Sequence, residues 1–592
     1  MLESLEKDMR MAHMTQIPKK YFVQSVLQAG CFAVIFAIAV FLLRHALTLP
    51  IPFLYDIPEW ILYVFFCGLI PAGAFLLSYF TPKLKASSRK SKINLDLPYA
   101  ITYMQALSTT ITLYEIFRSV YEAKDLYGEV SAECGMIVRD VELFGQDLIT
   151  AIENTMEVTP SENFKELLND LLLVHRSGGD LRGFFNAKSE SYREVSKNEM
   201  ESLLEFLEMI AEVYVTAFVA GPIAIIIMVV AQNISGQNTI GNLMPLMYIG
   251  LPLGALVLIF ILYVLLPPNN LVISKKEIRD SEYSSEIIRV QGLAKDPEFE
   301  KKINRRKRML KINDILHHPV KAYISSYIPA GILGGVFVVV VILLWYFGII
   351  EKGFPYYTIE VTICFVLMVA VLPLAVAYEI RNRYVKSVEK QLPEVLREIS
   401  DMRDVGMTLQ GAINMISGHK RGVLSTEIRM VSEEVKYGAS LSSALVRMEE
   451  RVGLTTVKRA ISLLVRASEV TDYIREILAI AIADLEHYLK MKNKRFNVSF
   501  VYLAIIYLSV GIFLFAAYEM NVAFINSFSS FNMAINTGNS AEQMFIIGII
   551  LAFFSGIMAG QLSANTILSG LKHSIVMLAM TIVTFVILVG VR

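Results

Sequence analysis

The stretches LDLPYAITYM, residues 95–104, and KQLPEVLREI, residues 390–399, decide the organisation of this chain. Each lies just after an apolar stretch with a basic end, and each opens a more polar block that another apolar stretch follows. The order apolar, polar, apolar therefore occurs twice, which is an internal repeat. The repeat predicts two similar helical modules attached to the same side of a membrane.

The composition places the chain among membrane proteins. Hydrophobic residues make up 54% of its 592 residues, and the mean hydropathy is +0.51, whereas soluble domains are about 45–50% apolar. The 55 basic and 55 acidic residues cancel, so the net charge predicts no global electrostatic partner. The four cysteines form neither a CxxC pattern nor a disulfide framework, and we expect small buried hydrophobic side chains.

About nine stretches are long and apolar enough to span a bilayer. They are residues 21–43, 59–80, 209–231, 244–266, 326–350, 357–378, 498–518, 543–563 and 573–591. Lysine and arginine cluster in alternate connections, so all basic segments fall on one side of the membrane. The positive-inside rule then predicts a multi-pass plasma-membrane protein with a cytoplasmic N-terminus and a C-terminus outside the cell.

The predicted fold class is an all-α polytopic membrane protein with two duplicated cytoplasmic helical-bundle domains. The expected domains are an N-terminal transmembrane pair (1–96), a first cytoplasmic helical domain (97–207), a transmembrane pair (208–266), a basic cytoplasmic linker (267–325), a transmembrane pair (326–378), a second cytoplasmic helical domain (379–496) and three C-terminal transmembrane helices (497–592).

The polar blocks have the three- and four-residue apolar spacing of helices. In the first block, Gly178 and Gly179 are expected to end one helix, and Asp180 is expected to cap the next. Gly145 and Leu148 match Gly438 and Leu441 of the second block at an offset of 293 residues, close to the 295 residues that separate the two Leu-Pro pairs. The simplest interpretation of the apolar stripes is bundle core, and that of the glycines is turn and cap geometry.

No catalytic constellation appears in the sequence. It has no GxxxxGK[ST] phosphate loop, no HExxH and no GxSxG, and its eight histidines show no metal-ligand spacing. The adjacent pair His317-His318 lies on a basic linker and does not face one metal. The sequence therefore predicts a protein that is not an enzyme and that uses no cofactor and no metal.

The basic run KKINRRKRMLK, residues 301–311, contains the docking candidates Lys301, Lys302, Arg305, Arg306, Lys307 and Arg308. It could bind anionic lipid head groups, dock an acidic protein partner, or act only as a topology determinant. Nucleic acid is not expected, because no stacking aromatic residues are interleaved.

Two further polar positions stand out. Glu212 is the main ionisable residue in an apolar stretch, and either an interfacial structural role or a functional role would explain it. Asn233 begins an Asn-Ile-Ser sequon on a predicted outer loop, and the sequence does not determine whether it carries a glycan.

These residues together resemble the inner-membrane platform proteins of type II secretion and type IV pili. Those proteins have duplicated helical cytoplasmic domains, here opening at Pro98 and Pro393, and a glycine-leucine element, here at Gly145 and Gly438. Their GExSGxL-like turn is matched by Ser177-Gly178-Gly179-Asp180-Leu181, whereas the second copy departs from it at Ser468-Glu469-Val470. The many spans and the C-terminal segment 556–588 are similar to the archaeal branch, which serves archaella and adhesive pili.

The resemblance implies a non-catalytic scaffold that couples a hexameric secretion ATPase to the extraction of pilin-like or archaellin-like subunits from the lipid bilayer. A symmetric homodimer is the default expectation. The acidic residues Glu199 to Glu208 and the basic residues Lys490 to Arg495 are expected to continue helices from the bundles into the membrane. A transporter with internal repeats is the alternative, and a receptor or signalling scaffold lacks an output module.

Overall fold

The computed structural model describes residues 2–45, 70–225, 227–228, 246–265, 319–347, 359–418, 422–470, 474–524 and 538–590, and isolated positions between 301 and 317. All regular structure in these residues is helical, so the predicted all-α class is confirmed for them. The chain divides into two compact units. The first is Met1–Glu194 with Val470–Asp472, and the second is Val195–Glu469 with Tyr473–Arg592.

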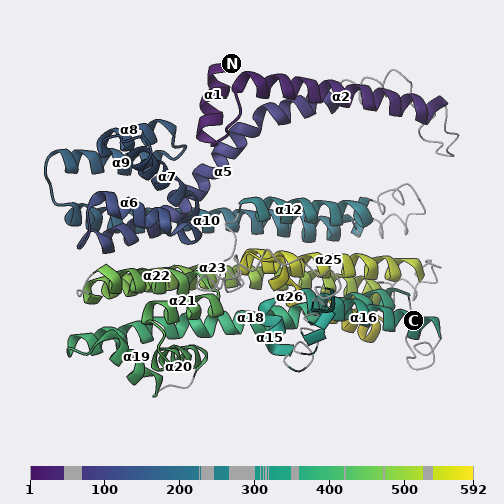
Figure 1. Ribbon diagram of the computed structural model, residues 1–592. Coiled ribbons are helices and arrows are strands. Elements are labelled where there is room, and N and C mark those ends of the chain that lie inside the picture. Colours follow the sequence, from purple (N-terminus) through teal and green to yellow (C-terminus); the bar gives the residue numbers. More distant parts are fainter. Residues whose placement is uncertain are drawn as a thin grey trace. The chain divides into compact units, whose positions relative to one another are not determined.

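The first unit joins a pair of long helices to a helical bundle (Figure 1). Its helices are α1 (Leu2–Met11), α2 (Pro18–His45), α5 (Ile70–Leu107), α6 (Leu113–Glu122), α7 (Lys124–Glu142), α8 (Leu148–Val158), α9 (Glu162–Arg176) and the first part of α10 (Leu181–Val215). The hydroxyl of Tyr21 donates a 2.7 Å hydrogen bond to the carbonyl of Ser78, which joins α2 to α5. The amphipathic α1 packs on α5 and buries Leu5 and Met9.

The second unit contains a bundle and an apolar half. Its elements after α10 are η2 (Thr216–Ala220), η4 (Leu246–Gly250), α12 (Leu251–Leu265), α15 (Pro319–Ser325), α16 (Ile328–Tyr346), α18 (Ile359–Asp404), α19 (Leu409–Ser417), α20 (Val423–Lys436), α21 (Leu441–Val452), α22 (Thr455–Val470), α23 (Ile474–Glu519), η5 (Met520–Phe524), α25 (Gly538–Ala564), α26 (Ile567–Ile582) and η6 (Val583–Val589). The bundle consists of α19 to α22 with the polar parts of α18 and α23.

The helices α5 to α10 and α18 to α23 follow the same order along the chain. Each run begins with a long helix, continues through four shorter helices and ends with another long helix. The second helix of each run has a threonine cap. Thr112 accepts a hydrogen bond from the backbone N–H of Glu115, and Thr408 accepts one from that of Gly411. A threonine hydroxyl at this position satisfies an N–H that the first helical turn leaves unpaired.

The Leu-Pro pairs lie inside long helices. Pro98 is within α5 and Pro393 is within α18, although an internal proline removes one backbone hydrogen bond and often kinks a helix. Leu97 and Leu392 are both buried in the bundle cores. The polar blocks therefore begin within continuous helices, and the expected domain limits at 96/97 and 378/379 fall inside them.

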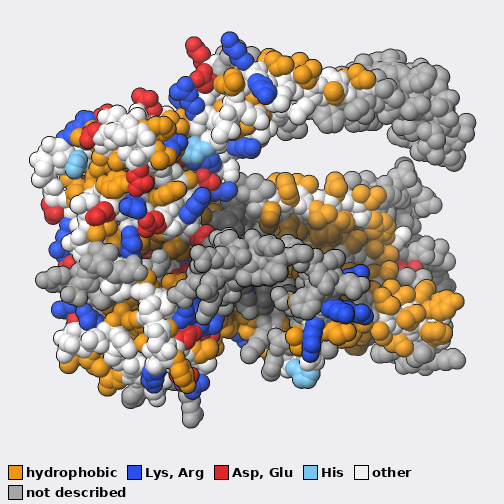
Figure 2. All heavy atoms as spheres, viewed as in Figure 1, with side chains coloured by type: hydrophobic (Ala, Val, Ile, Leu, Met, Phe, Trp, Pro, Cys, Tyr) orange, Lys and Arg blue, Asp and Glu red, His pale blue; other side chains and the backbone are white. Residues whose placement is uncertain are grey.

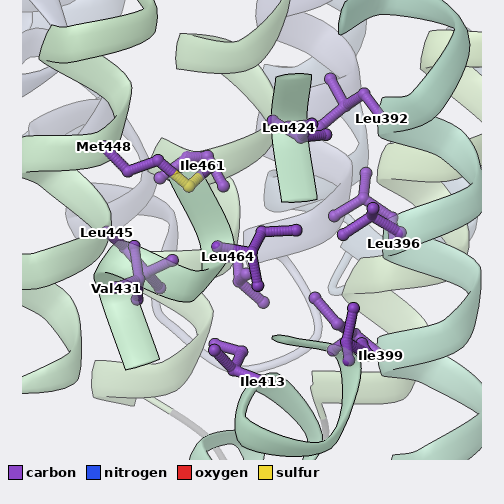
Figure 3. A pocket seen from close by; sticks show the side chains of 13 residues that line it. Leu392, Leu396, Ile399, Ile413, Leu424, Val431, Leu445, Met448, Ile461 and Leu464 are labelled. Atoms are coloured by element: carbon purple, nitrogen blue, oxygen red, sulfur yellow. The ribbon is translucent and has the colours of Figure 1, made fainter. Parts of the chain in front are cut away.

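The core of the second bundle is apolar and closely packed. Figure 3 shows side chains of five helices converging, among them Leu396 of α18, Ile413 of α19, Leu445 of α21 and Leu464 of α22. The cavity between them is about 20 Å³, which is room for about one water molecule. The helices of this bundle thus enclose an ordinary hydrophobic core, as the apolar stripes predicted.

Within the described residues, five helices are long and apolar enough to cross a membrane: Ile328–Tyr346, Glu360–Asp404, Arg475–Val522, Ala541–Ala564 and Ile567–Val589. A shorter apolar helix covers Met247–Tyr263. Hydrophobic side chains gather on the surface over α12 and α16 (Figure 2), as expected where lipid replaces water. The chain is therefore a multi-pass membrane protein, and the count of nine spans stays a prediction because part of the 59–80 stretch lies outside the described residues.

The apolar half is built around α25. In the apolar 18-residue stretch of α16 only 11% of the residues are buried, whereas in the corresponding stretch of α25 78% are buried. The α26 helix crosses α25 so closely that their backbones are in contact. A Cβ atom added to Gly560 would overlap the backbone of Gly570, and one added to Gly556 would overlap the backbone of Ser574. Small residues four apart on each helix thus permit the approach.

Candidate functional site

Three long helices, α10, α18 and α23, continue from polar into apolar sequence. The α10 helix includes the acidic residues Glu199 to Glu208 and runs on to Val215, and α23 includes Lys490 to Arg495 and runs on to Glu519. The predicted helix continuity at both places is confirmed. A continuous helix transmits displacement along its axis because each turn is hydrogen bonded to the next.

Charged groups join these helices where their polar parts meet their apolar parts, a region we call the junction. The Lys492 Nζ lies 2.6 and 2.9 Å from the two carboxylate oxygens of Glu389, whose side chain is only 6% exposed. This pair joins α23 to α18. Lys494 forms an ion pair with Glu201, which joins α23 to α10 and lowers the pKa of Glu201 through the hydrogen bond that Lys494 donates.

The Glu201–Lys494 pair joins equivalent positions of the two repeats. The two residues are 293 positions apart, and the same offset relates Gly145 to Gly438. Equivalent residues that contact each other are typical of isologous interfaces, in which one surface meets its own copy. Here one repeat supplies the acid and the other the base, so the contact is attractive.

Hydrogen bonds extend the junction into the apolar half. The Tyr502 hydroxyl donates to the Leu204 carbonyl at 2.9 Å, and the Tyr214 hydroxyl lies 2.7 Å from Ser555 Oγ. Both contacts are buried, where an unpaired hydroxyl would cost more than in water. They connect α10 to α23 and to α25, so a displacement of α10 acts directly on the central membrane helix.

The predicted turn residues lie where the sequence placed them. Gly178 has φ +68°, and the Gly179 N–H donates to the Val174 carbonyl at 2.9 Å, which ends α9. Asp180 accepts hydrogen bonds from the N–H groups of Arg182 and Gly183, at 2.9 and 3.0 Å, and caps α10. The predicted helix end and cap are both confirmed.

The remaining candidates are dispersed. Glu212 is exposed on α10. Lys301, Lys302, Arg305 and Arg306 are exposed, whereas Lys307, Arg308 and Asn233 lie outside the described residues. Cys134 and Cys364 are buried, but Cys31 is exposed on α2, contrary to expectation. In the part of the chain that the structure describes, no group of three His, Cys, Asp or Glu side chains is arranged to hold a metal ion.

Sequence reasoning missed a buried charged cluster in the first unit. Arg89 of α5 lies 2.6 Å from the Glu133 carboxylate and 2.9 Å from that of Glu129, and it also donates to the Met11 carbonyl. The Glu133 side chain is fully buried. Burial raises the pKa of Glu133, although Arg89 opposes the rise, and burial lowers the pKa of the nearby His13 to about 4. The sequence signal that could have revealed this cluster is Glu133, a glutamate among the buried apolar positions of α7.

Comparison with known families gives two matches to the description "Type II secretion system (T2SS), protein F", at residues 104–229 and 395–520. Each match covers the shorter bundle helices and the long helix that leaves them for the membrane. This chain carries two type II secretion system F domains. The resemblance inferred from the repeat is thereby confirmed, and the F domain is the membrane-platform domain of secretion and pilus systems.

The F-domain chain also has archaeal relatives. It is 23% identical over 524 residues to "Uncharacterized protein MJ1286" of Methanocaldococcus jannaschii, covering 87% of this chain and 83% of that protein. It is 24% identical over 201 residues to "Flagella accessory protein J" of the same organism, covering 34% of this chain and 33% of that protein. No solved structure matches the chain.

Proposed function

We propose that this chain is the non-catalytic platform for assembly of a type IV pilus-like filament, either an archaellum or an adhesive pilus. A hexameric cytoplasmic ATPase would move the F-domain bundles, and the platform would lift pilin-like or archaellin-like subunits out of the bilayer. The observation that carries the proposal is the junction. Continuous helices leave both F domains for the membrane, and ion pairs and buried hydrogen bonds join them there.

The proposed topology has nine spans, a cytoplasmic N-terminus and an external C-terminus. The two F domains would then both face the cytoplasm, within the expected domains 97–207 and 379–496, and meet the same ATPase. Pro98, Gly145, Gly178, Gly179, Pro393 and Gly438 would serve the architecture of these domains, and Glu212 a polar contact near the membrane surface. A symmetric homodimer is the simplest assembly of such a platform.

Deleting the gene and imaging the cells by electron microscopy, with swimming scored in parallel, tests the proposal. Loss of filaments together with swimming would identify an archaellum platform, and loss of thin pili alone would identify an adhesive-pilus platform. Filaments that persist in the absence of any paralogue would overturn the proposal and favour a transporter.

Reversing one charge at the junction is expected to impair assembly more than folding. Glu201→Lys places two lysines in contact, and both side chains are more than 40% exposed, so solvent screens the repulsion and the cost in stability is small. We expect filament number to fall severalfold, with normal protein level, because the contact between α10 and α23 becomes repulsive. The swap Glu201→Lys/Lys494→Glu should restore it.

Glu205→Lys is the matched control, because it makes the same charge change at an exposed position of α10, one turn after Glu201. Filament counts that fall equally for this control, or a swap that fails to rescue, would remove the ion pair from the coupling route.

We also propose that the basic linker contacts anionic lipid head groups. Lys301, Lys302, Arg305 and Arg306 are exposed together with Met309 and Leu310, which are 62% and 63% exposed. Exposed apolar side chains among bases suit a membrane surface better than water. Each base contributes about 1 kcal/mol near such a surface.

A polarity-sensitive dye at Met309→Cys, in a variant without the native cysteines, should report a less polar environment in anionic nanodiscs than in zwitterionic ones. Changing Lys301, Lys302, Arg305 and Arg306 to glutamine should abolish the difference, since it removes about 4 kcal/mol of attraction to the anionic head groups. A signal independent of lipid charge would leave the run as a topology determinant only.

A further inference from the structure

Each F-domain bundle has an exposed aromatic residue directly before a glycine with a left-handed backbone. In the first unit this residue is Phe144, which is 65% exposed, followed by Gly145 with φ +64°. Leu143 beside it is 75% exposed. The Arg139 guanidinium lies 5.6 Å from the centre of the Phe144 ring, so the ring stands among polar groups at the surface and lies outside the core.

The second unit has the same arrangement at the equivalent position. Tyr437 is 92% exposed and precedes Gly438, which has φ +98°. Val405, 83% exposed, precedes Gly406 with φ +88°. Only glycine adopts such φ values without strain, so both turns hold the preceding side chain out from the bundle in a defined direction.

These residues lie at the end of each bundle that is farthest from its membrane helices. In the first unit α5 comes from the membrane side and ends at Leu107, and Tyr114 at the start of the next helix bonds Glu142 at 2.6 Å. In the second unit α18 ends at Asp404 (Figure 1). There Asn414 of α19 is hydrogen bonded to Ser432 of the antiparallel α20, so the end of α20 lies beside the start of α19. We call these two ends the distal tips.

The distal tips are unlike the other apolar surface of the chain. The exposed side chains of α12 and α16 belong to apolar helices, where lipid is expected to cover them, whereas the tips lie at the ends of the bundles away from such helices. The flanking residues differ between the repeats, since Leu143 corresponds to Lys436, while an aromatic residue and a left-handed glycine occur in both. Large exposed apolar side chains at equivalent places are typical of a binding surface.

We propose that the distal tips are the docking points for a soluble homo-oligomer that offers the same apolar socket repeatedly. Two equivalent aromatic residues in one chain match a partner whose subunits are identical, as a ring of subunits provides. This inference rests on the proposed function, in which that partner is the hexameric ATPase. Each tip would insert its aromatic ring into a socket on one subunit, and the left-handed turn would limit the entropy lost on binding.

Photo-crosslinking in cells tests the tips one at a time. A benzophenone amino acid at Phe144 and, in a separate strain, at Tyr437 should both give an adduct with one soluble protein, identified by mass spectrometry as the same P-loop ATPase. A probe at Leu95, which is 48% exposed on α5 twelve residues before that helix ends, is the control and should give no such adduct. Adducts only with lipid, only with a second copy of this chain, or with different proteins at the two tips would overturn the inference.

The double variant Phe144→Ala/Tyr437→Ala should reduce copurification of the ATPase at least tenfold and abolish filaments, with unchanged level and gel-filtration profile. Leu95→Ala is the control away from the tips and should behave as wild type. Normal filaments and normal copurification in the tip variant would refute the docking points alone, whereas filaments that persist in the gene deletion would refute the proposed function itself.

Discussion

Replacing Gly560 with leucine is expected to disrupt the membrane half of the protein. The Gly560 Cβ would overlap the backbone of Gly570, and backbone, unlike a flexible side chain, cannot rotate away. Gly570 in turn leaves only 2.6 Å between an added Cβ and the Gly556 carbonyl. The helices would have to separate along α25, the most buried candidate span, and we expect a loss of about 3 kcal/mol or more. The measurement is the yield and melting temperature of detergent-purified protein.

Gly335→Leu is the matched control for this prediction. Gly335 also lies in an apolar helix, α16, but an added Cβ there meets nothing within 4 Å. The control protein should purify and melt like wild type. A Gly560→Leu protein with wild-type yield and melting temperature would show that α25 and α26 do not approach as closely as the structure has them.

Replacing Arg89 with methionine is expected to destabilise the first unit by about 3–5 kcal/mol at pH 8, since it leaves the fully buried Glu133 carboxylate without its closest cation. Burial already raises the pKa of Glu133, and the positive charge of Arg89 is the largest effect that lowers it. Removing the guanidinium therefore raises that pKa further. The readout is labelling of Cys134, which is buried beside Glu133, along a urea gradient in a variant that lacks the other cysteines.

The loss should shrink as the pH falls from 8 to 5. A carboxyl group whose pKa is higher in the folded state binds its proton more tightly there, so the cost of the ionised form disappears as the pH falls through the folded pKa. In the wild-type protein His13, with a pKa of about 4, is neutral over this range, whereas removing Arg89 also removes a positive charge that lowers the His13 pKa, so His13→Gln is added to both the variant and its reference. Arg89→Met/Glu133→Gln should recover most of the stability at pH 8. A loss that is independent of pH, or that the second substitution does not relieve, would mean that Arg89 acts through packing alone.

Local features of the chain could be predicted because they depend on neighbouring residues. The turn at Gly178 and Gly179, the cap at Asp180 and the helices that continue through Glu201 and Lys494 follow from glycine geometry, capping and helical periodicity. The duplication was visible because both copies kept the same order of apolar and polar blocks, and the two F-domain matches confirm it.

Contacts between distant residues could not be predicted in this way. The lysines before α23 enters the membrane were visible as a basic cluster, but the sequence did not show that Lys492 meets Glu389 or that Lys494 meets Glu201. Arg89 was likewise visible only as one of the bases that set topology. Its partner Glu133 lies 44 residues away, and no spacing rule links the two.

The sequence by itself determined the class, the repeat and the helices, because hydrophobic periodicity and turn chemistry act over a few residues. Only the tertiary structure decided which glycines permit contact between α25 and α26, which charges are buried, and that Phe144 and Tyr437 stand at the distal ends of their bundles. Those properties depend on how helices pack, and packing brings together residues whose separation along the chain carries no local signal.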